Sequence, residues 1–289
     1  MGTSLLSALK TKQISTSLGA MAWMKAAAIA GLLVALYHGV LAEMAVDWWT
    51  EPAWSQGLLI PPLAGYVAWL RRRETLEIAP QEDLRGVWLT AAGCLLFLLG
   101  NLGAEFFLSR MSFVILLVAL VWTFWGIGRL RTLAFPFLLL ATMVPLPTIV
   151  YNALTAPLQL FATSSATSIA QGLGITVFQD GNIINLAHTS LGVEEACSGL
   201  NSLSALAVAA ILLAYLICFR LRTRMLLILL SVPLAISINV LRVAGTALIA
   251  DYREEFAMGF YHLFSGWLVF IMGFGLLYGA ALALHRLAD

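Results

Sequence analysis

The sequence predicts an all-α protein that crosses a membrane several times. Of its 289 residues, 61% are hydrophobic and only 11% are charged, whereas soluble domains carry about 25% charged residues. Apolar runs close to the roughly 20 residues that span a bilayer recur along the chain. The formal net charge is +1, which gives no sign of a nucleic-acid partner. The expected surroundings are therefore the lipid bilayer.

Eight apolar runs define the expected transmembrane helices. We expect the whole chain, 1–289, to form a single integral-membrane domain. Residues 1–25 would be a cytoplasmic N-terminal segment that leads into a retained first helix rather than a cleaved signal peptide. The runs cover roughly residues 26–46, 55–70, 86–104, 111–127, 132–150, 198–218, 225–249 and 265–284.

Basic residues between these runs predict the orientation. They separate into a group of 13 and a group of three among the 16 lysines and arginines. By the positive-inside rule the larger group lies in the cytoplasm, and an even number of spans then places both termini there. The larger group includes Arg71, Arg72, Arg73, Arg129, Arg131, Arg220, Arg222, Arg224 and Arg286, and the smaller group is Arg110, Arg242 and Arg253.

The longest extracytoplasmic segment is expected at residues 151–197. Its first part, "ALTAPLQLFATSSATSIAQGLGI", mixes apolar and hydroxyl residues at roughly helical spacing, which predicts an interfacial helix that lies on or dips into the membrane. Its second part alternates apolar and polar residues around Asp180-Gly181. That pattern predicts a short β-hairpin.

The stretch "VEEACSGLNSL" places Cys197 at the outer end of the sixth apolar run. Cys197 and Cys218 are 21 positions apart on that run, or about 31 Å in a helix, whereas a disulfide needs Cα atoms within about 7 Å. We therefore predict a free Cys197 thiol, which a helix N-terminus would favour as the nucleophilic thiolate. Glu194 and Glu195 oppose that charge, so a nearby cation is required. Cys94 and Cys218 are better explained as small apolar residues within their helices.

A nucleophilic cysteine needs a base, and histidine is the first candidate. His38 falls within the first span and His285 in the cytoplasmic tail. His262, in "GFYHLFSGW", is expected at the same outer boundary as Cys197, and we prefer it. His188 in the outer segment remains an alternative base.

Arg242, in "SINVLRVAGTALIADY", is expected about one and a half turns inside the outer end of the seventh span. An arginine at that depth is costly and indicates a functional cavity, although snorkelling or a structural pair with Glu194 or Glu195 would also explain it. Asn239 precedes Arg242 by one turn, and Asn201 follows Cys197 by one turn. Nothing has the ligand spacing of a metal site, so no metal or cofactor is expected.

A polar intramembrane patch alone also fits a transporter or a polysaccharide-assembly protein. A transporter predicts inverted repeats with broken helices in matching positions, but Pro145, Pro147 and Pro233 form no such pairs. A polysaccharide polymerase or ligase would depend on arginines in large outer loops rather than on a cysteine. A thiol oxidoreductase would need a second cysteine at the outer face.

From Trp48 onward the sequence resembles the exosortase/archaeosortase family of membrane-embedded cysteine transpeptidases. The resemblance rests on "EEACSGLNSL", "NVLRV" and "FYHLFSGW", in that order, with support from "MVPLP", "GNIINL" and "WSQGLLIPPLAGYVAWLRRR". One departure is visible, because the family often has Ser-His-Gly where this chain has Ser55-Gln56-Gly57.

The resemblance implies a cysteine protease or transpeptidase in the inner membrane of a Gram-negative bacterium that makes exopolysaccharide. Its active site would face the periplasm. Its partners would be exported proteins that carry a C-terminal Pro-Glu-Pro signal, a transmembrane helix and a basic tail. Cys197, Arg242 and His262 would be catalytic, with Glu194, Glu195, Asn201 and Asn239 in support.

Overall fold

The computed structural model describes residues 2–193, 199–218, 220–252 and 260–288. Side chains are described for Met24 and from Ala27 onward, apart from those of residues 260–263 and 288. Within these ranges six helices are long and apolar enough to cross a membrane. This finding confirms an all-α, multi-pass architecture. The six helices are α1 (Gly2–Thr50), α4 (Arg85–Leu102), α5 (Phe106–Thr132), α8 (Leu200–Ile217), α9 (Leu221–Tyr252) and α11 (Phe260–Ala288).

The predicted count of eight spans is not confirmed. The second and fifth runs form the short helices α2 (Ile60–Leu70) and α6 (Ala134–Ala141), which have 11 and 8 residues. At 1.5 Å per residue neither crosses a hydrocarbon core of about 30 Å. Pro61 and Pro62 fix where α2 begins, after the 3₁₀ turn η1 (Ser55–Leu58), and α3 (Arg72–Glu77) follows its end. The two short helices pack against each other.

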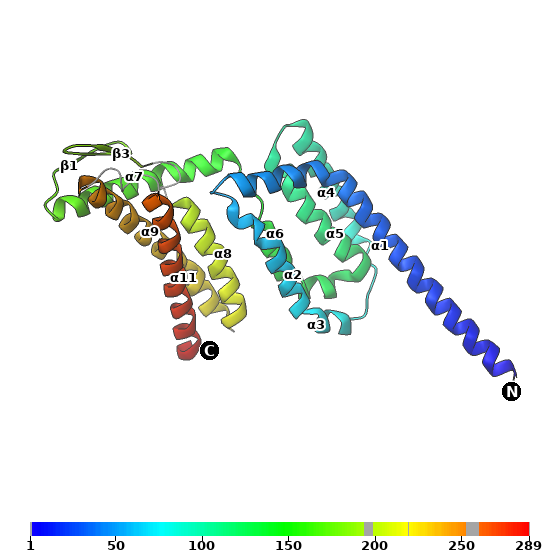
Figure 1. The fold of residues 1–289 in the computed structure, drawn as a ribbon. Helices are drawn as coiled ribbons and strands as arrows, with labels where there is room; N and C mark the ends of the chain where they lie inside the picture. The colour runs from blue at the N-terminus through cyan, green and yellow to red at the C-terminus, as the bar shows by residue number, and fades with distance from the viewer. Residues whose placement is uncertain (1, 194–198, 219, 253–259, 289) are drawn as a thin grey trace.

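A long helix and a small sheet lie across one end of the transmembrane helices (Figure 1). The helix is α7 (Thr148–Gly172), and the antiparallel sheet has the order β1 (Val177–Asp180), β2 (Ile183–Leu186), β3 (Ser190–Gly192). The predicted hairpin is present, with Asp180 paired to Ile183 and Gly181 at φ +58° in the turn. The third strand was not predicted. The position of α7 at a membrane surface remains a prediction.

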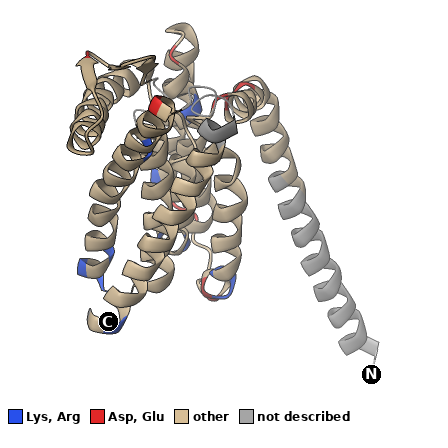
Figure 2. Cartoon of the chain, turned by 60° about the vertical axis from the view of Figure 1, so that its left-hand side comes forward, with Lys and Arg blue, Asp and Glu red and all other residues tan. Residues whose placement is uncertain are grey.

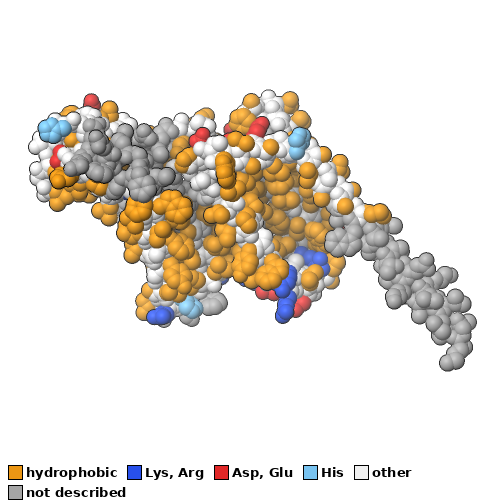
Figure 3. Space-filling view, viewed as in Figure 1, with side chains coloured by type: hydrophobic (Ala, Val, Ile, Leu, Met, Phe, Trp, Pro, Cys, Tyr) orange, Lys and Arg blue, Asp and Glu red, His pale blue; other side chains and the backbone are white. Residues whose placement is uncertain are grey.

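Charged side chains concentrate at the two ends of the helices (Figure 2). We call the end that holds Arg71, Arg131, Arg224 and Arg286 the arginine end, and the end that holds Glu43, Asp47, Glu51 and Glu105 the acidic end. Between them the surface is largely hydrophobic (Figure 3). The described arginines of the larger predicted group lie at the arginine end, as expected if all face one side of a membrane. Which side that is remains a prediction.

The helices form two halves that meet along α8. In the first half, α1, α2, α5 and α6 share a core that includes Met44, Ile60 and Leu139. In the second half, α8, α9 and α11 share a core around Leu206 and Leu277. Val208 and Leu212 of α8 also pack against the first core. A further cluster joins α7 and the sheet to α9, so the sheet is fixed to the C-terminal part of that helix.

Close packing of α4 on α5 depends on three buried glycines spaced seven residues apart. Gly86, Gly93 and Gly100 face Thr123, Leu116 and Ser109 respectively. A Cβ at Gly100 would lie 2.6 Å from the backbone nitrogen of Ser109. The missing side chains therefore let the two backbones approach closely, as in other membrane helix pairs.

Substitution of Gly100 by alanine should destabilise the protein, because backbone atoms of α5 must move to admit the Cβ. We expect a loss of about 1–3 kcal/mol, the usual cost of overpacking. Gly65→Ala is the matched control, since Gly65 is also helical and a Cβ there meets nothing within 4 Å. It should be neutral or stabilise by up to about 1 kcal/mol. Thermal unfolding in detergent measures both, and equal stability of the two variants would contradict this packing.

Candidate active site

The candidate site surrounds the segment that carries Cys197. Cys197, Glu194 and Glu195 lie outside the described residues, and so does the side chain of His262. The structure does describe Arg242, Asn201 and Asn239, together with the chain on both sides of the segment. The site can therefore be built from its two ends and from the helices around it.

Val193 fixes the chain where it enters the segment. Its carbonyl oxygen accepts hydrogen bonds from the side-chain amides of Gln159, on α7, and Asn182, in the β1–β2 turn, the latter at 3.2 Å. Its backbone N–H donates to the carbonyl of Asn182 at 2.9 Å. The Val193 side chain is buried in the cluster between the sheet and α9. Helix and hairpin together therefore hold the residue that precedes Glu194.

Gly199 fixes the chain where it leaves the segment. It is the N-cap of α8 and has φ +90°, a backbone conformation that suits glycine. A Cβ at this position would lie 2.8 Å from Nδ2 and 2.9 Å from Cγ of Asn239. Asn239 is only 1% exposed. The first turn of α8 thus rests directly on the Asn239 side chain of α9.

Arg242 lies one helical turn beyond Asn239 on α9 and extends toward α11. Its Nε donates to the Ser265 hydroxyl at 3.4 Å, and its guanidinium is 3.6 Å from where a Cβ would stand on Gly266. His262 precedes Ser265 by three positions in α11, so both backbone positions lie on one side of that helix. The start of α8, the C-terminal part of α9 and the first turns of α11 therefore converge.

The sequence around this site also matches a known protein family. The model of the transmembrane exosortase family matches residues 48–279, a range that contains every site residue named above. The chain belongs to the transmembrane exosortase family. None of the individual proteins compared and no solved structure matches it.

In this exosortase, hydrogen bonds between polar side chains connect α8 to the first half of the molecule. Tyr151, on α7, donates its hydroxyl to Oδ1 of Asn201 at 3.3 Å, and its ring lies 5.1 Å from that of Trp54. The Ser204 hydroxyl donates to Oε1 of Gln56 at 3.2 Å. Gln56 is the residue that departs from the family's Ser-His-Gly pattern. Ser204, which binds Gln56, follows Asn201 by one turn of α8. The η1 turn that carries Gln56 therefore lies beside the site.

An acidic cavity of about 550 Å³ opens beside Trp54 and Tyr151. Asp47 pairs with Arg110 at 2.6 Å, and the Arg110 side chain is only 7% exposed. One cation among four carboxylates leaves the cavity negative overall, and two aromatic rings separate it from Asn201. The other carboxylates that line it are Glu43, Glu51 and Glu105.

His188, the alternative base, can be placed relative to the residues that hold Val193, and the choice between His188 and His262 remains a prediction. His188 is exposed in the turn that joins β2 to β3. Asn182, which holds Val193, lies at the other end of β2. The four-residue strand β2 lies between Asn182 and His188 and is about 13 Å long.

Several residues that build the site were missed by the sequence reasoning. Gln159, Asn182 and Ser265 act through contacts with residues distant in sequence, and no periodicity marks an amide or hydroxyl for that role. Gly199 was quoted only as part of a motif, although its position after the cysteine and before an apolar run was a signal for a helix cap. Thr246, which shares a face with Arg242, donates to the Arg242 carbonyl of its own helix.

Gly199→Ala should destabilise the exosortase more than the same change at Gly174. Both glycines have a similar positive φ, +90° and +85°, so both substitutions carry the same backbone strain of about 1–2 kcal/mol. A Cβ at Gly174 meets nothing within 4 Å, whereas one at Gly199 collides with Asn239. Thermal unfolding of the two variants compares them directly, and an equal loss of stability would contradict the contact between α8 and Asn239.

Proposed function

We propose that this exosortase is a membrane-embedded cysteine protease and transpeptidase with Cys197 as its nucleophile. The observation that supports this most is the anchoring of both ends of the segment 194–198. Val193 is held by α7 and the hairpin, and Gly199 by Asn239. Two peptide units separate Cys197 from Gly199, so their Cα atoms are at most about 7.6 Å apart. We propose that the thiol acts beside the place where Arg242 meets Ser265 of α11.

The reaction begins when the Cys197 thiol loses its proton to His262 and attacks the scissile carbonyl carbon. A C–S bond forms, and the carbonyl oxygen takes the negative charge of the tetrahedral intermediate. Arg242 stabilises that oxyanion with its guanidinium. When the C–N bond breaks, His262 returns the proton to the leaving amine.

The product of this step is a thioester between Cys197 and the new C-terminus of the substrate. Attack by a second nucleophile on the thioester carbon releases the substrate and restores the thiol. Asn239 acts as a positioning residue, since it supports Gly199. Asn201 fixes the first turn of α8 through Tyr151, and Glu194 and Glu195 set the charge that Arg242 balances.

The proposed substrates are exported proteins with a C-terminal Pro-Glu-Pro signal, a transmembrane helix and a basic tail. Family membership supports this class. With the arginine end in the cytoplasm, a substrate of that design would present its signal at the acidic end, where the candidate site lies. Its basic tail would remain on the arginine side. The proposed location is the bacterial inner membrane, with both termini in the cytoplasm and the site facing the periplasm.

Cys197→Ala should abolish cleavage of a tagged substrate of this class in cells, because no other group replaces the thiolate. Cys94→Ala is the matched control, since Cys94 is an exposed, free cysteine far along the chain from the site. It should leave cleavage unchanged. Loss of the substrate's C-terminal tail, followed by immunoblot, measures both. Full cleavage by Cys197→Ala would exclude the mechanism.

Arg242→Lys distinguishes transition-state stabilisation from a structural role. Lysine keeps the charge but loses the planar fork that binds an oxyanion at two points. We expect cleavage to fall by about 10²–10³-fold at normal membrane abundance, the scale of losing one oxyanion donor. Arg222→Lys, at the exposed start of α9, is the control. Normal cleavage by Arg242→Lys combined with low abundance of Arg242→Ala would instead indicate a structural pair.

The orientation can be tested by labelling single cysteines in intact cells. On a background without the native cysteines, a membrane-impermeant maleimide should react with a cysteine at Asp180 and not with one at Arg222. Permeabilised cells provide the control for reactivity at both positions. The reverse pattern would place the candidate site in the cytoplasm and contradict the proposed reaction.

A further inference from the structure

A second cavity, of about 740 Å³, opens at the arginine end between the two halves of the molecule. Arg71 reaches it from the junction of α2 and α3, Arg131 from the end of α5, and Arg224 from the start of α9. The proposed reaction uses none of these residues. Three arginines from three separate elements therefore face one space on the side opposite to the candidate active site.

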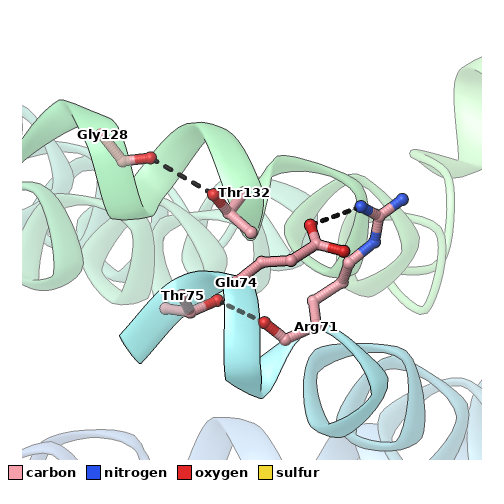
Figure 4. A network of polar contacts seen from close by, with 5 residues as sticks. All are labelled: Arg71, Glu74, Thr75, Gly128 and Thr132. Atoms are coloured by element: carbon pink, nitrogen blue, oxygen red, sulfur yellow. Dashed lines mark hydrogen bonds and ion pairs between the residues drawn. The ribbon is translucent and has the colours of Figure 1, made fainter. Parts of the chain in front are cut away.

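Positive charge in this cavity is only partly balanced by the protein. Glu74, the one carboxylate that lines it, binds Arg71 at 2.6 Å (Figure 4), and that bond raises the pKa of Arg71 further. Nε of Arg224 donates to the carbonyl of Cys218 at 2.8 Å, a neutral partner. The Arg131 side chain makes no hydrogen bond or ion pair with the described part of the chain. An anion would supply the missing charge and acceptors.

Two of the three arginines, Arg71 and Arg224, are held in place before any ligand binds. The guanidinium carbons of Arg71 and Arg224 lie 5.3 and 5.7 Å from the centre of the Tyr215 ring, which itself stacks on Phe135 with 3.6 Å between centres. The Thr75 hydroxyl donates to the carbonyl of Arg71 at 2.9 Å and stabilises the turn that presents it (Figure 4). Two like charges fixed around one ring repel each other, which favours an anion between them.

The same cavity has an apolar wall. Phe135 and Leu138 of α6 line it, and the Leu138 side chain is 57% exposed. Phosphate alone would make no use of this wall, whereas a phospholipid would place its headgroup on the arginines and an acyl chain along α6. The cavity also lies where α5 and α8 end and α9 begins, the depth at which lipid headgroups meet transmembrane helices.

We propose that this cavity binds the phosphate headgroup of an anionic phospholipid, with an acyl chain against Phe135 and Leu138. The bound lipid would join Arg71 and Arg131 of the first half to Arg224 of the second. It would thereby hold the two halves together at the end where Phe135 and Arg71 of the first half meet the Tyr215 ring of the second. This inference does not depend on the proposed protease activity.

Native mass spectrometry of the purified full chain in a neutral detergent tests the proposal. Dioleoyl phosphatidylglycerol should form a one-to-one complex that dioleoyl phosphatidylcholine does not form at the same concentration. Arg131→Gln should weaken that complex by about tenfold, the effect of one charge-assisted contact, and should fold normally because Arg131 has no described polar partner. Arg222→Gln removes an exposed arginine from the same end, outside the cavity, and should bind lipid as the wild type does.

Three outcomes would overturn the lipid site. Equal weakening by Arg131→Gln and Arg222→Gln would show attraction to the whole basic end rather than to the cavity. Equal binding of phosphatidylcholine would show that the anionic group is irrelevant. Displacement of phosphatidylglycerol by inorganic phosphate at equal concentration would identify a free phosphate site. In the expected case phosphatidylglycerol also raises the unfolding temperature of the wild type, and this increase is lost in Arg131→Gln.

Discussion

The contact between Gly199 and Asn239 is the constraint on which the proposed active site depends. It brings the first turn of α8 against α9 at a distance that no side chain at position 199 would permit. Asn239 in turn precedes Arg242 by one turn, and Arg242 reaches Ser265 of α11. One close contact thus sets the spacing among three helices. Gly199, the residue that follows the cysteine segment 194–198, takes its position from that spacing.

The remaining architecture supports this contact from two directions. On one side, α7 and the hairpin pack on α9 and hold Val193, the residue that precedes the cysteine segment. On the other, Tyr151 and Gln56 connect the start of α8 to the first half of the molecule. These partly buried side-chain bonds orient α8. The proposed lipid would do the same at the arginine end.

Sequence reasoning predicted the features that follow from composition and local chemistry. Long apolar runs predicted the six long helices, Asp180-Gly181 predicted the hairpin turn, and the arginine clusters predicted the two charged ends. The predicted count of eight spans is not confirmed, because hydropathy measures how apolar a stretch is and not where its helix begins. Pro61 and Pro62 start α2 too late to cross a bilayer, and α6 ends after only 8 residues. Such breaks shorten a helix without making its sequence polar.

For the site, too, local sequence predicted some residues, whereas others depend on contacts between residues far apart in sequence. The spacing of Asn239 and Arg242 predicted that they share one face of a helix, and both residues lie in α9 three positions apart. The partners that hold the segment could not be predicted, since Gln159 and Asn182 meet Val193 only through the packing of α7 and the sheet. The same holds for Ser265, which lies 23 positions from Arg242. Amides and hydroxyls are common in loops and helices, and only tertiary structure distinguishes those that act.

Direct capture of the proposed thioester tests the central claim most sharply. The purified exosortase is mixed with a substrate protein that carries a Pro-Glu-Pro signal, quenched in acid within its turnover time, and digested for mass spectrometry. We predict an acyl group from the substrate on the peptide that contains Cys197, and its release by hydroxylamine. Cleavage of the substrate with an adduct on Cys94 or Cys218, or with no adduct at any quench time, would contradict nucleophilic catalysis by Cys197.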